Sequence, residues 1–326
     1  MTQIFLLGAT GTIGGSILVD LKKTHPEANI MALVRSAAHN DAVRAAGAEP
    51  VQGTFSDLDI IEEQASKADI VLNAAQPDDL QLANAILKGL KKRKKSGQGV
   101  PSYIHTSGTM IFLDGNKAGA YDKNAKVWTD SAEDIKLLTP QMFHGQVDVP
   151  LLKAGEEGYV NTYIICPSNV HGGGKGPVQR TTLTYRWLTG ASLGAGAAFY
   201  LGEGSNVLGF VHIDDILDLY LKVVDLALST NGPAKTSPYE RYFIGSVEQS
   251  TNKELMEAIA KRIHASGKLP TAEPKSVTAE EAGMLALLGG NMLLKPIRGR
   301  EIGWVPKGPS VYDTIDADLE AVLKSM

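Results

Sequence analysis

Short apolar runs alternate with amphipathic segments through the first half of the chain. The runs predict strands at Ile4–Leu7, Ile30–Val34, Val51–Gln52, Ile70–Asn73, Tyr103–Thr106 and Thr162–Cys166. The segments between them predict helices at Thr12–Lys23, Ala37–Ala46, Leu58–Ser66, Leu80–Lys95 and Met142–Glu157. Strands that are apolar throughout and separated by helices are typical of a parallel sheet covered on both faces. The pattern therefore predicts an α/β fold with a doubly wound parallel sheet, a Rossmann fold.

The second half of the chain has a different pattern. Glycine-rich segments follow Cys166 and continue to Gly209. Beyond them the pattern predicts strands at Val211–Ile213 and Arg241–Ile244 and helices at Asp215–Leu228 and Lys253–Ala265. We therefore expect a Rossmann domain over residues 1–170 and a smaller α+β substrate region over residues 171–326, partly interleaved with it. A non-periodic insertion at 112–141 follows the fifth strand, where binding sites are usually built.

A glycine-rich turn connects the first strand to the first helix. Gly8 permits a tight turn, Gly11 lets backbone approach a ligand, and Gly14 lets the helix pack close to the sheet. The start of the helix then offers free N–H groups and the positive end of its dipole to a pyrophosphate. Because the turn lies at the start of a βαβ pattern, it predicts a dinucleotide-binding site.

The end of the second predicted strand bears on which dinucleotide binds. Sites that prefer NAD place an acidic residue there for the ribose 2′-hydroxyl, whereas an arginine accommodates the 2′-phosphate of NADP. Here the strand ends in Val34-Arg35-Ser36, without an acidic residue. Arg35 could hold a phosphate through charge-assisted hydrogen bonds, so the sequence favours NADP over NAD.

Composition and charge narrow the classes of partner. The 326 residues are 43% hydrophobic, enough for a sizeable core, and the net charge of −4 gives no electrostatic case for nucleic acid. The single cysteine, Cys166, fits a reducing compartment. No apolar stretch reaches the roughly 18 residues of a membrane span, and the start of the chain lacks the features of a secretory signal. We expect a cytoplasmic protein without a metal site.

Six segments carry a resemblance to one superfamily: Gly8-x-x-Gly11-x-x-Gly14, Asn73-Ala74-Ala75, Ile104-His105-Thr106-Ser107-Gly108, Cys166-Pro167-Ser168-Asn169-Val170-His171-Gly172, Phe210-Val211-His212-Ile213-Asp214-Asp215 and Gly303-Trp304-Val305-Pro306. With them the chain resembles the atypical or extended short-chain dehydrogenase/reductases, which include epimerase/dehydratase-like and NmrA-like proteins. The segments span nearly the whole chain, and they are specific for the superfamily but not for one reaction.

The resemblance also implies which residues contact the cofactor. They would be Gly8, Thr10, Gly11, Thr12 and Ile13 at the pyrophosphate, Arg35 at the adenosine phosphate, Ala74 and Ala75 along the ribose, and the backbone near Thr106 and Pro167 at the nicotinamide. Members of the superfamily usually have Gly-Asp-Leu near the adenine, whereas this chain has Gly53-Thr54-Phe55. The aspartate is missing, and Phe55 could still pack on the base.

The catalytic residues of the superfamily are replaced. Its members use a Tyr-x-x-x-Lys pair before the sixth strand and a hydroxyl after the fifth strand to exchange a proton with the substrate oxygen. Here His144 and Asp148 occupy the positions of the tyrosine and lysine. Gly108 occupies that of the hydroxyl residue, with Ser107 and Thr109 on either side. His171, where tyrosine is frequent, could face the substrate.

The replacement leaves two interpretations open. In one, His144 is the acid and base, since a histidine titrates at about 6.5, and Asp148, one helical turn later, orients its imidazole or raises its pKa. Ser107 would then be the catalytic hydroxyl. In the other, His144 and Asp148 form a surface pair worth a few tenths of a kcal/mol, and nothing is turned over.

Three functions follow from these interpretations. The first is an NADP-dependent oxidoreductase acting on a small organic carbonyl or alcohol, held between the insertion and the Gly172–Gly176 loop. The second is a catalytically silent dinucleotide-binding sensor that signals through a protein partner. The third, an epimerase or dehydratase that retains NAD, is disfavoured by Arg35 and the missing Tyr/Lys pair. The chain could also form a homodimer.

Overall fold

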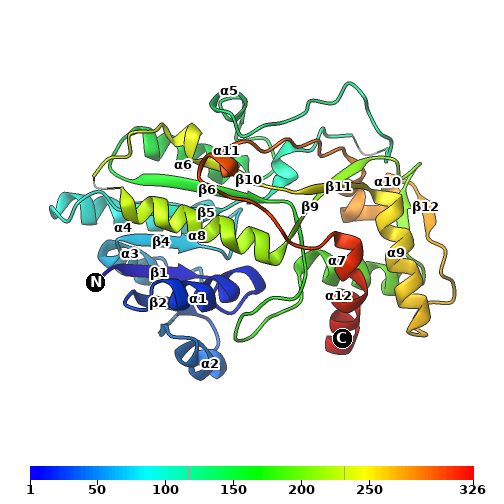
Figure 1. Ribbon diagram of the computed structural model, residues 1–326, viewed down its shortest axis with the longest axis horizontal. Coiled ribbons are helices and arrows are strands. Elements are labelled where there is room, and N and C mark those ends of the chain that lie inside the picture. Colours follow the sequence, from blue (N-terminus) through cyan, green and yellow to red (C-terminus); the bar gives the residue numbers. More distant parts are fainter. Residues whose placement is uncertain (117, 231) are drawn as a thin grey trace.

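A parallel β-sheet forms the centre of the molecule. The computed structural model describes residues 1–116, 118–230 and 232–326 (Figure 1). Within these ranges the sheet has seven strands, β1 (Gln3–Leu7), β2 (Asn29–Val34), β3 (Glu49–Gln52), β4 (Ile70–Asn73), β5 (Ser102–Thr106), β6 (Asn161–Pro167) and β10 (Tyr242–Gly245). Their order is β10-β6-β5-β4-β1-β2-β3, and each neighbouring pair is parallel. The order reverses between β1 and β4, which is where Rossmann folds bind their ligands.

Helices cover both faces of this sheet. They are α1 (Thr12–Thr24), α2 (Asn40–Ala45), α3 (Leu58–Lys67), α4 (Leu80–Lys95), α6 (Gly145–Glu156) and α8 (Ile213–Ser229). Figure 1 shows α1 and α8 lying on the same face, where they contact each other. On the opposite face, α3, α4 and α6 contribute to a second buried cluster. The α/β doubly wound architecture predicted from the sequence is therefore confirmed.

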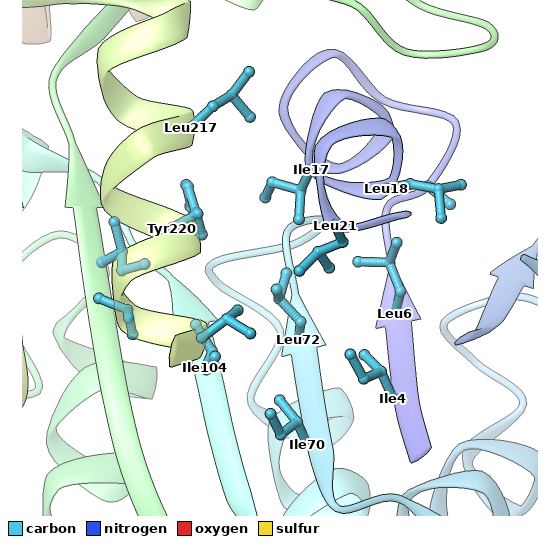
Figure 2. Close-up of a cluster of buried hydrophobic side chains, with 14 of the residues drawn as sticks. Ile4, Leu6, Ile17, Leu18, Leu21, Ile70, Leu72, Ile104, Leu217 and Tyr220 are labelled. Carbon is cyan, nitrogen blue, oxygen red and sulfur yellow. The ribbon is translucent and has the colours of Figure 1, made fainter. Parts of the chain in front are cut away.

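Figure 2 shows why the alternating pattern specifies this arrangement. Aliphatic side chains of β1, β4 and β5, such as Leu6, Leu72 and Ile104, point toward α1 and α8. Leu21 and Tyr220 point from the two helices toward the strands. All five are buried, and burial of a large apolar side chain contributes about 1.5 to 3 kcal/mol.

The chain beyond β6 forms smaller sheets packed on a third core. One sheet has the order β11-β9-β7, from β7 (Asn169–His171), β9 (Val207–His212) and β11 (Glu248–Thr251), and another pairs β8 (Phe199–Leu201) with β12 (Lys275–Val277). The helices here are α7 (Leu183–Gly194), α9 (Asn252–Ala265), α10 (Ala279–Ala282), α11 (Arg298–Glu301) and α12 (Val311–Ser325). Two elements of this half nevertheless belong to the main body, because β10 completes the large sheet and α8 covers it.

The insertion after β5 packs against the end of the chain. It follows the 3₁₀ helix η2 (Thr109–Phe112), and it contains α5 (Ala132–Ile135). Trp128 forms a parallel bridge with Leu294. The Asp130 carboxylate accepts hydrogen bonds from the backbone of Ile297 and Arg298, at 2.7 and 3.0 Å. Other short 3₁₀ helices are η1 (Ala37–His39), η3 (Pro238–Arg241) and η4 (Gly283–Gly289).

None of the helices within the described residues is both long and apolar enough to cross a membrane.

Candidate functional site

The glycine turn after β1 forms a cradle that larger residues could not build. Gly8 has a φ of +98°, and a Cβ on it would lie 2.6 Å from the carbonyl oxygen of Ala74. A Cβ on Gly14 would lie 2.4 Å from the carbonyl oxygen of Gly8. Both distances are shorter than any real Cβ contact, so β1, α1 and the end of β4 can approach each other this closely only through glycine.

The start of α1 is open to an anion. Gly11 is its N-cap residue, and no side chain of residues 1–116, 118–230 or 232–326 caps the first turn, which begins with Thr12 and Ile13. Those N–H groups and the positive end of the helix dipole favour a negatively charged group. The residues present therefore fit a pyrophosphate. That Gly8, Thr10, Gly11, Thr12 and Ile13 contact it stays a prediction.

A loop between β7 and α7 lies across this cradle. A Cβ on Gly15 would lie 3.0 Å from the Cα of Gly176, and the Thr12 hydroxyl donates to the carbonyl of Thr181 at 2.7 Å. The Lys175 ammonium pairs with Asp214 of α8 at 2.6 Å and with Asp20 of α1 at 3.3 Å. The loop therefore closes one side of the cradle and ties it to both helices.

The two residues expected at the adenosine lie at the ends of β2 and β3. Arg35 follows β2 and is exposed, as is Ser36. Phe55 follows β3 and is half-buried against the apolar cluster on the α3 and α4 face. Thr54 stands where the superfamily usually has the aspartate. The Asp57 carboxylate accepts hydrogen bonds from the backbone N–H and the hydroxyl of Thr54. Those bonds hold the pKa of Asp57 below its usual value and fix the turn beside Phe55.

The remaining predicted cofactor residues lie at adjacent strand ends. Ala74 and Ala75 follow β4, while Thr106 and Pro167 are the last residues of β5 and β6. These strands are neighbours, and all run in the same direction, so their carboxyl ends meet at one edge. The Thr106 hydroxyl lies 2.6 Å from the phenolic oxygen of Tyr220 on α8, which fixes that side chain.

His144 lies directly before α6 in a strained conformation. Its φ is +61°, and among the residues that the structure describes it is the only non-glycine residue with a positive φ. Its Nδ1 lies 2.8 Å from a carboxylate oxygen of Asp78, in the loop between β4 and α4. Its Nε2 lies 2.8 Å from where a Cβ on Gly108 would be. Such strain costs about 1 to 3 kcal/mol and clusters at functional sites.

The structure corrects the expected pairing of His144 with Asp148. Asp148 is fully buried inside α6, and one of its oxygens accepts hydrogen bonds from Ser107 at 2.7 Å and from Tyr242 at 2.8 Å. The two residues are not a surface pair either, because His144 is only 8% exposed. The helix starts at Gly145, three residues later than predicted, so His144 is outside it and turns toward Asp78.

Ser107 has a buried side chain, and its hydroxyl donates to Asp148 at 2.7 Å. Its role as the catalytic hydroxyl stays a prediction. His171 is corrected as well, since it is 2% exposed and its Nδ1 lies 2.8 Å from the Thr314 hydroxyl of α12. Burial lowers the pKa of His171 to about 4, and the nearby His212 adds to the shift. His171 is therefore buried beside α12.

A second histidine lies next to Asp148. His105 of β5 is fully buried, and its Nε2 lies 3.7 Å from the second Asp148 oxygen, Oδ1. Neither atom has a hydrogen-bond partner among the residues that the structure describes. Burial lowers the pKa of His105 to about 3 and raises the pKa of Asp148 to about 7. Two hydrogen bonds, from Ser107 and Tyr242, oppose the shift of Asp148 without cancelling it.

Sequence reasoning missed three residues of this site: Asp78, His105 and Tyr242. Asp78 lies directly before Asp79, whose side chain caps α4, so the pair is typical of a helix start. His105 and Tyr242 lie in predicted strands and are buried. In the sequence nothing distinguishes them from aromatic residues that only pack in the core. Each of the three contacts a residue that is distant in the chain. Asp78 contacts His144, which is 66 residues away. His105 and Tyr242 contact Asp148, which is 43 and 94 residues away.

The chain is similar in sequence to one known family and to one named fungal protein. Residues 8–130 match the model of a family described as NAD(P)H-binding. A protein of an Acremonium species named oxidase ucsJ is 28% identical over 333 residues, covering 96% of this chain and 95% of that protein.

Two solved structures share the fold over nearly the full length. A UDP-glucose 4-epimerase of Thermotoga maritima, solved with UDP-glucose, has a TM-score of 0.66 at 16% identity and covers 99% of both chains. DesIV of Streptomyces venezuelae, a dTDP-glucose 4,6-dehydratase solved with NAD, has a TM-score of 0.64 at 17% identity, covering 99% of this chain and 97% of that one. Residues 8–130 thus match an NAD(P)H-binding family, and the chain as a whole shares the α/β fold of these two structures.

Proposed function

We propose that the protein is an NADP-dependent oxidoreductase in which His144 and Asp78 replace the tyrosine and lysine of related enzymes. The observation that carries the proposal is the strained His144 backbone, which directs the imidazole between Asp78 and Gly108. The substrate would be a small organic carbonyl or alcohol. The similarity to a protein named an oxidase supports redox chemistry. A cytoplasmic location, which fits the single cysteine, belongs to the same proposal.

The chemistry of the pair follows from its geometry. The Asp78 carboxylate accepts a hydrogen bond from Nδ1 of His144, so the proton that can be exchanged is the one on Nε2. Nε2 gives its proton to a substrate oxygen during reduction and takes it back during oxidation, while Asp78 stabilises the protonated imidazole. Bound NADP(H) supplies or accepts the hydride. A side chain on residue 108 would clash with Nε2, so the glycine is what lets the imidazole take this position.

Purified protein tests the proposal when it is incubated with NADPH and a panel of aldehydes and ketones. We expect oxidation of NADPH with at least one of them, measured by the loss of absorbance of the reduced nicotinamide. NADPH binding without turnover on any member of the panel would contradict the proposal and would favour the sensor. NAD that remains bound through purification would instead favour an epimerase or dehydratase.

Asp78→Asn tests the orienting carboxylate. We expect kcat to fall about 10- to 100-fold, the usual effect of removing a group that orients a functional histidine. The dissociation constant of NADPH should stay unchanged, because Asp78 lies outside the glycine cradle. Asp79→Asn is the matched control, since Asp79 only caps α4. An equal loss of kcat in both variants would assign Asp78 a purely structural role.

The preference for NADP depends on Arg35. We expect Arg35→Ala to weaken NADPH binding about 10- to 100-fold and to leave NADH binding within a factor of two, because the guanidinium would hold only the 2′-phosphate. Titration of the reduced nicotinamide fluorescence with both cofactors measures the change. Lys23→Ala, which removes an exposed cation at the far end of α1, is the control. Equal affinity of the unmodified protein for both cofactors would refute the preference.

A further inference from the structure

The loop between β7 and α7 is bonded to the glycine cradle on both sides of Arg180. The backbone N–H of Gln179 donates to the carbonyl of Thr10 at 3.2 Å. The carbonyl of Thr181 accepts a hydrogen bond from the Thr12 hydroxyl at 2.7 Å. Thr10 lies in the turn after β1, and Thr12 is the first residue of α1. Arg180 therefore lies between two residues that are fixed to the cradle.

The guanidinium of Arg180 is held beside the first turn of α1. Its Nε donates to the carbonyl of Gly176 at 3.1 Å. Gly176 itself packs on the start of the helix, since a Cβ on it would lie 3.0 Å from the Cα of Gly15 and 3.3 Å from the carbonyl oxygen of Gly11. The bond uses Nε and leaves the two terminal nitrogens of the guanidinium to donate elsewhere. A guanidinium charge is therefore held close to the end of α1 that offers free N–H groups.

The two cations of this loop differ in their partners. The Lys175 ammonium pairs with the carboxylates of Asp20 and Asp214, at 3.3 and 2.6 Å, so its charge is already balanced. Arg180 is exposed, and no carboxylate in the part of the chain that the structure describes pairs with it. Lys175 thus attaches the loop to α1 and α8, whereas the charge of Arg180 is available to a ligand.

The start of α1 alone does not balance the charge of a pyrophosphate. The pyrophosphate of a dinucleotide carries a negative charge on each phosphate, whereas the start of a helix supplies about half of a positive charge. An arginine adds a whole charge and can donate to two phosphate oxygens at once. The helix start and a guanidinium together therefore balance most of the charge of the anion.

We propose that Arg180 is a further cofactor-binding residue, whose guanidinium binds the pyrophosphate of the dinucleotide from the side of the β7–α7 loop. The inference rests on the binding of NADP(H) in the proposed function and not on turnover. It gives the two arginines different ligands, because Arg35 follows β2 and would hold only the 2′-phosphate of NADP. Arg180 binds a group that NAD and NADP share, so it raises the affinity for both.

Arg180→Met removes the charge and keeps most of the length of the side chain. We expect the dissociation constants of NADPH and NADH to rise by the same factor, about 10- to 100-fold, which is the usual effect of losing hydrogen bonds to a charged group. Arg180→Lys keeps the charge without the forked geometry, so it should bind both cofactors more tightly than Arg180→Met. Titration of the reduced nicotinamide fluorescence measures these constants.

Arg186→Met is the matched control. Arg186 of α7 also donates from Nε to the carbonyl four residues earlier, that of Thr182 at 3.4 Å, so the two arginines make the same kind of backbone contact. Both dissociation constants should stay within a factor of two in this variant. An equal loss of affinity in Arg186→Met and Arg180→Met would show that only the general positive charge of this surface matters, and it would overturn the proposal.

Two further measurements separate a pyrophosphate contact from a damaged loop. Adenosine 2′-monophosphate has the 2′-phosphate but no pyrophosphate, so Arg180→Met should leave its binding unchanged, whereas Arg35→Ala should weaken it. Added salt should weaken NADH binding more in the unmodified protein than in Arg180→Met, because screening acts on the charge that the variant lacks. Weaker binding of adenosine 2′-monophosphate to Arg180→Met, or a loss of NADH affinity that does not vary with salt, would refute the contact.

Binding and turnover together separate this contact from the proposed reaction. If Arg180→Met binds NADPH and NADH as tightly as the unmodified protein does, the contact is absent, whatever the turnover. If Arg180→Met loses affinity in a protein that oxidises no NADPH with any carbonyl, only the proposed reaction is contradicted. An unmodified protein that binds neither cofactor would contradict both.

Discussion

Replacing His144 with asparagine is expected to lower kcat about a thousandfold. Asparagine cannot exchange a proton near neutral pH, and a positioned general acid or base contributes about 10²- to 10⁴-fold. Asparagine tolerates a positive φ better than most residues, so the start of α6 should keep its conformation. NADPH affinity should be unchanged because the glycine cradle lies at a different strand end. Steady-state kinetics and cofactor titration on the same preparation measure both quantities.

Two other substitutions at position 144 separate the proton from the backbone strain. An alanine at a φ of +61° is strained, whereas a glycine is not, so His144→Gly should be about 1 kcal/mol more stable than His144→Ala. Both should be as inactive as His144→Asn, because all three lack the imidazole. If His144→Gly retained turnover, the imidazole would not be the acid and base.

Gly8→Ala is expected to abolish cofactor binding and to destabilise the fold by about 2 to 5 kcal/mol. The new Cβ would lie 2.6 Å from the carbonyl oxygen of Ala74, and the positive φ of residue 8 would add strain. Relief requires β1 and the end of β4 to separate, which opens the turn that presents the N–H groups of α1. Denaturant unfolding gives the loss of stability, and titration with NADPH gives the loss of binding.

Gly97→Ala isolates the effect of the backbone conformation. Gly97 has a φ of +81°, similar to that of Gly8, but no atom of the described part of the chain lies within 4 Å of a Cβ at that position. This variant should lose only the 1 to 2 kcal/mol of the left-handed conformation and should bind NADPH normally. Equal effects at the two glycines would show that contact with β4 contributes nothing to the cradle.

The elements with a strong periodic pattern were predictable from the sequence. Ile70–Asn73 and Leu80–Lys95 were predicted with the bounds that the structure has. These segments are apolar throughout or amphipathic over several turns, so local pattern and tertiary burial agree. The three-residue strands β7, β8 and β12 were not predicted, because a strand this short contains too few residues to show a period.

The candidate site was only partly predictable, and the reason lies in its backbone. His144 is found from the sequence by its distance before β6. The helical pattern of the sequence continues through it, so no feature of the sequence indicates its positive φ. That conformation starts α6 at Gly145 and gives His144 and Asp148 different partners, each distant in the chain. Spacing along a helix predicts a shared face only where both residues are helical.

The place of β10 in the large sheet bears on how the protein is synthesised. A ribosome completes residues 1–170 with β6 as an edge strand, although every residue of β6 is buried in the finished protein. The neighbour that covers this edge, Tyr242–Gly245, emerges only after about seventy further residues. Exposed apolar edges promote aggregation during synthesis. The chain therefore depends on its own later half, or on a chaperone, to protect β6 in the interval.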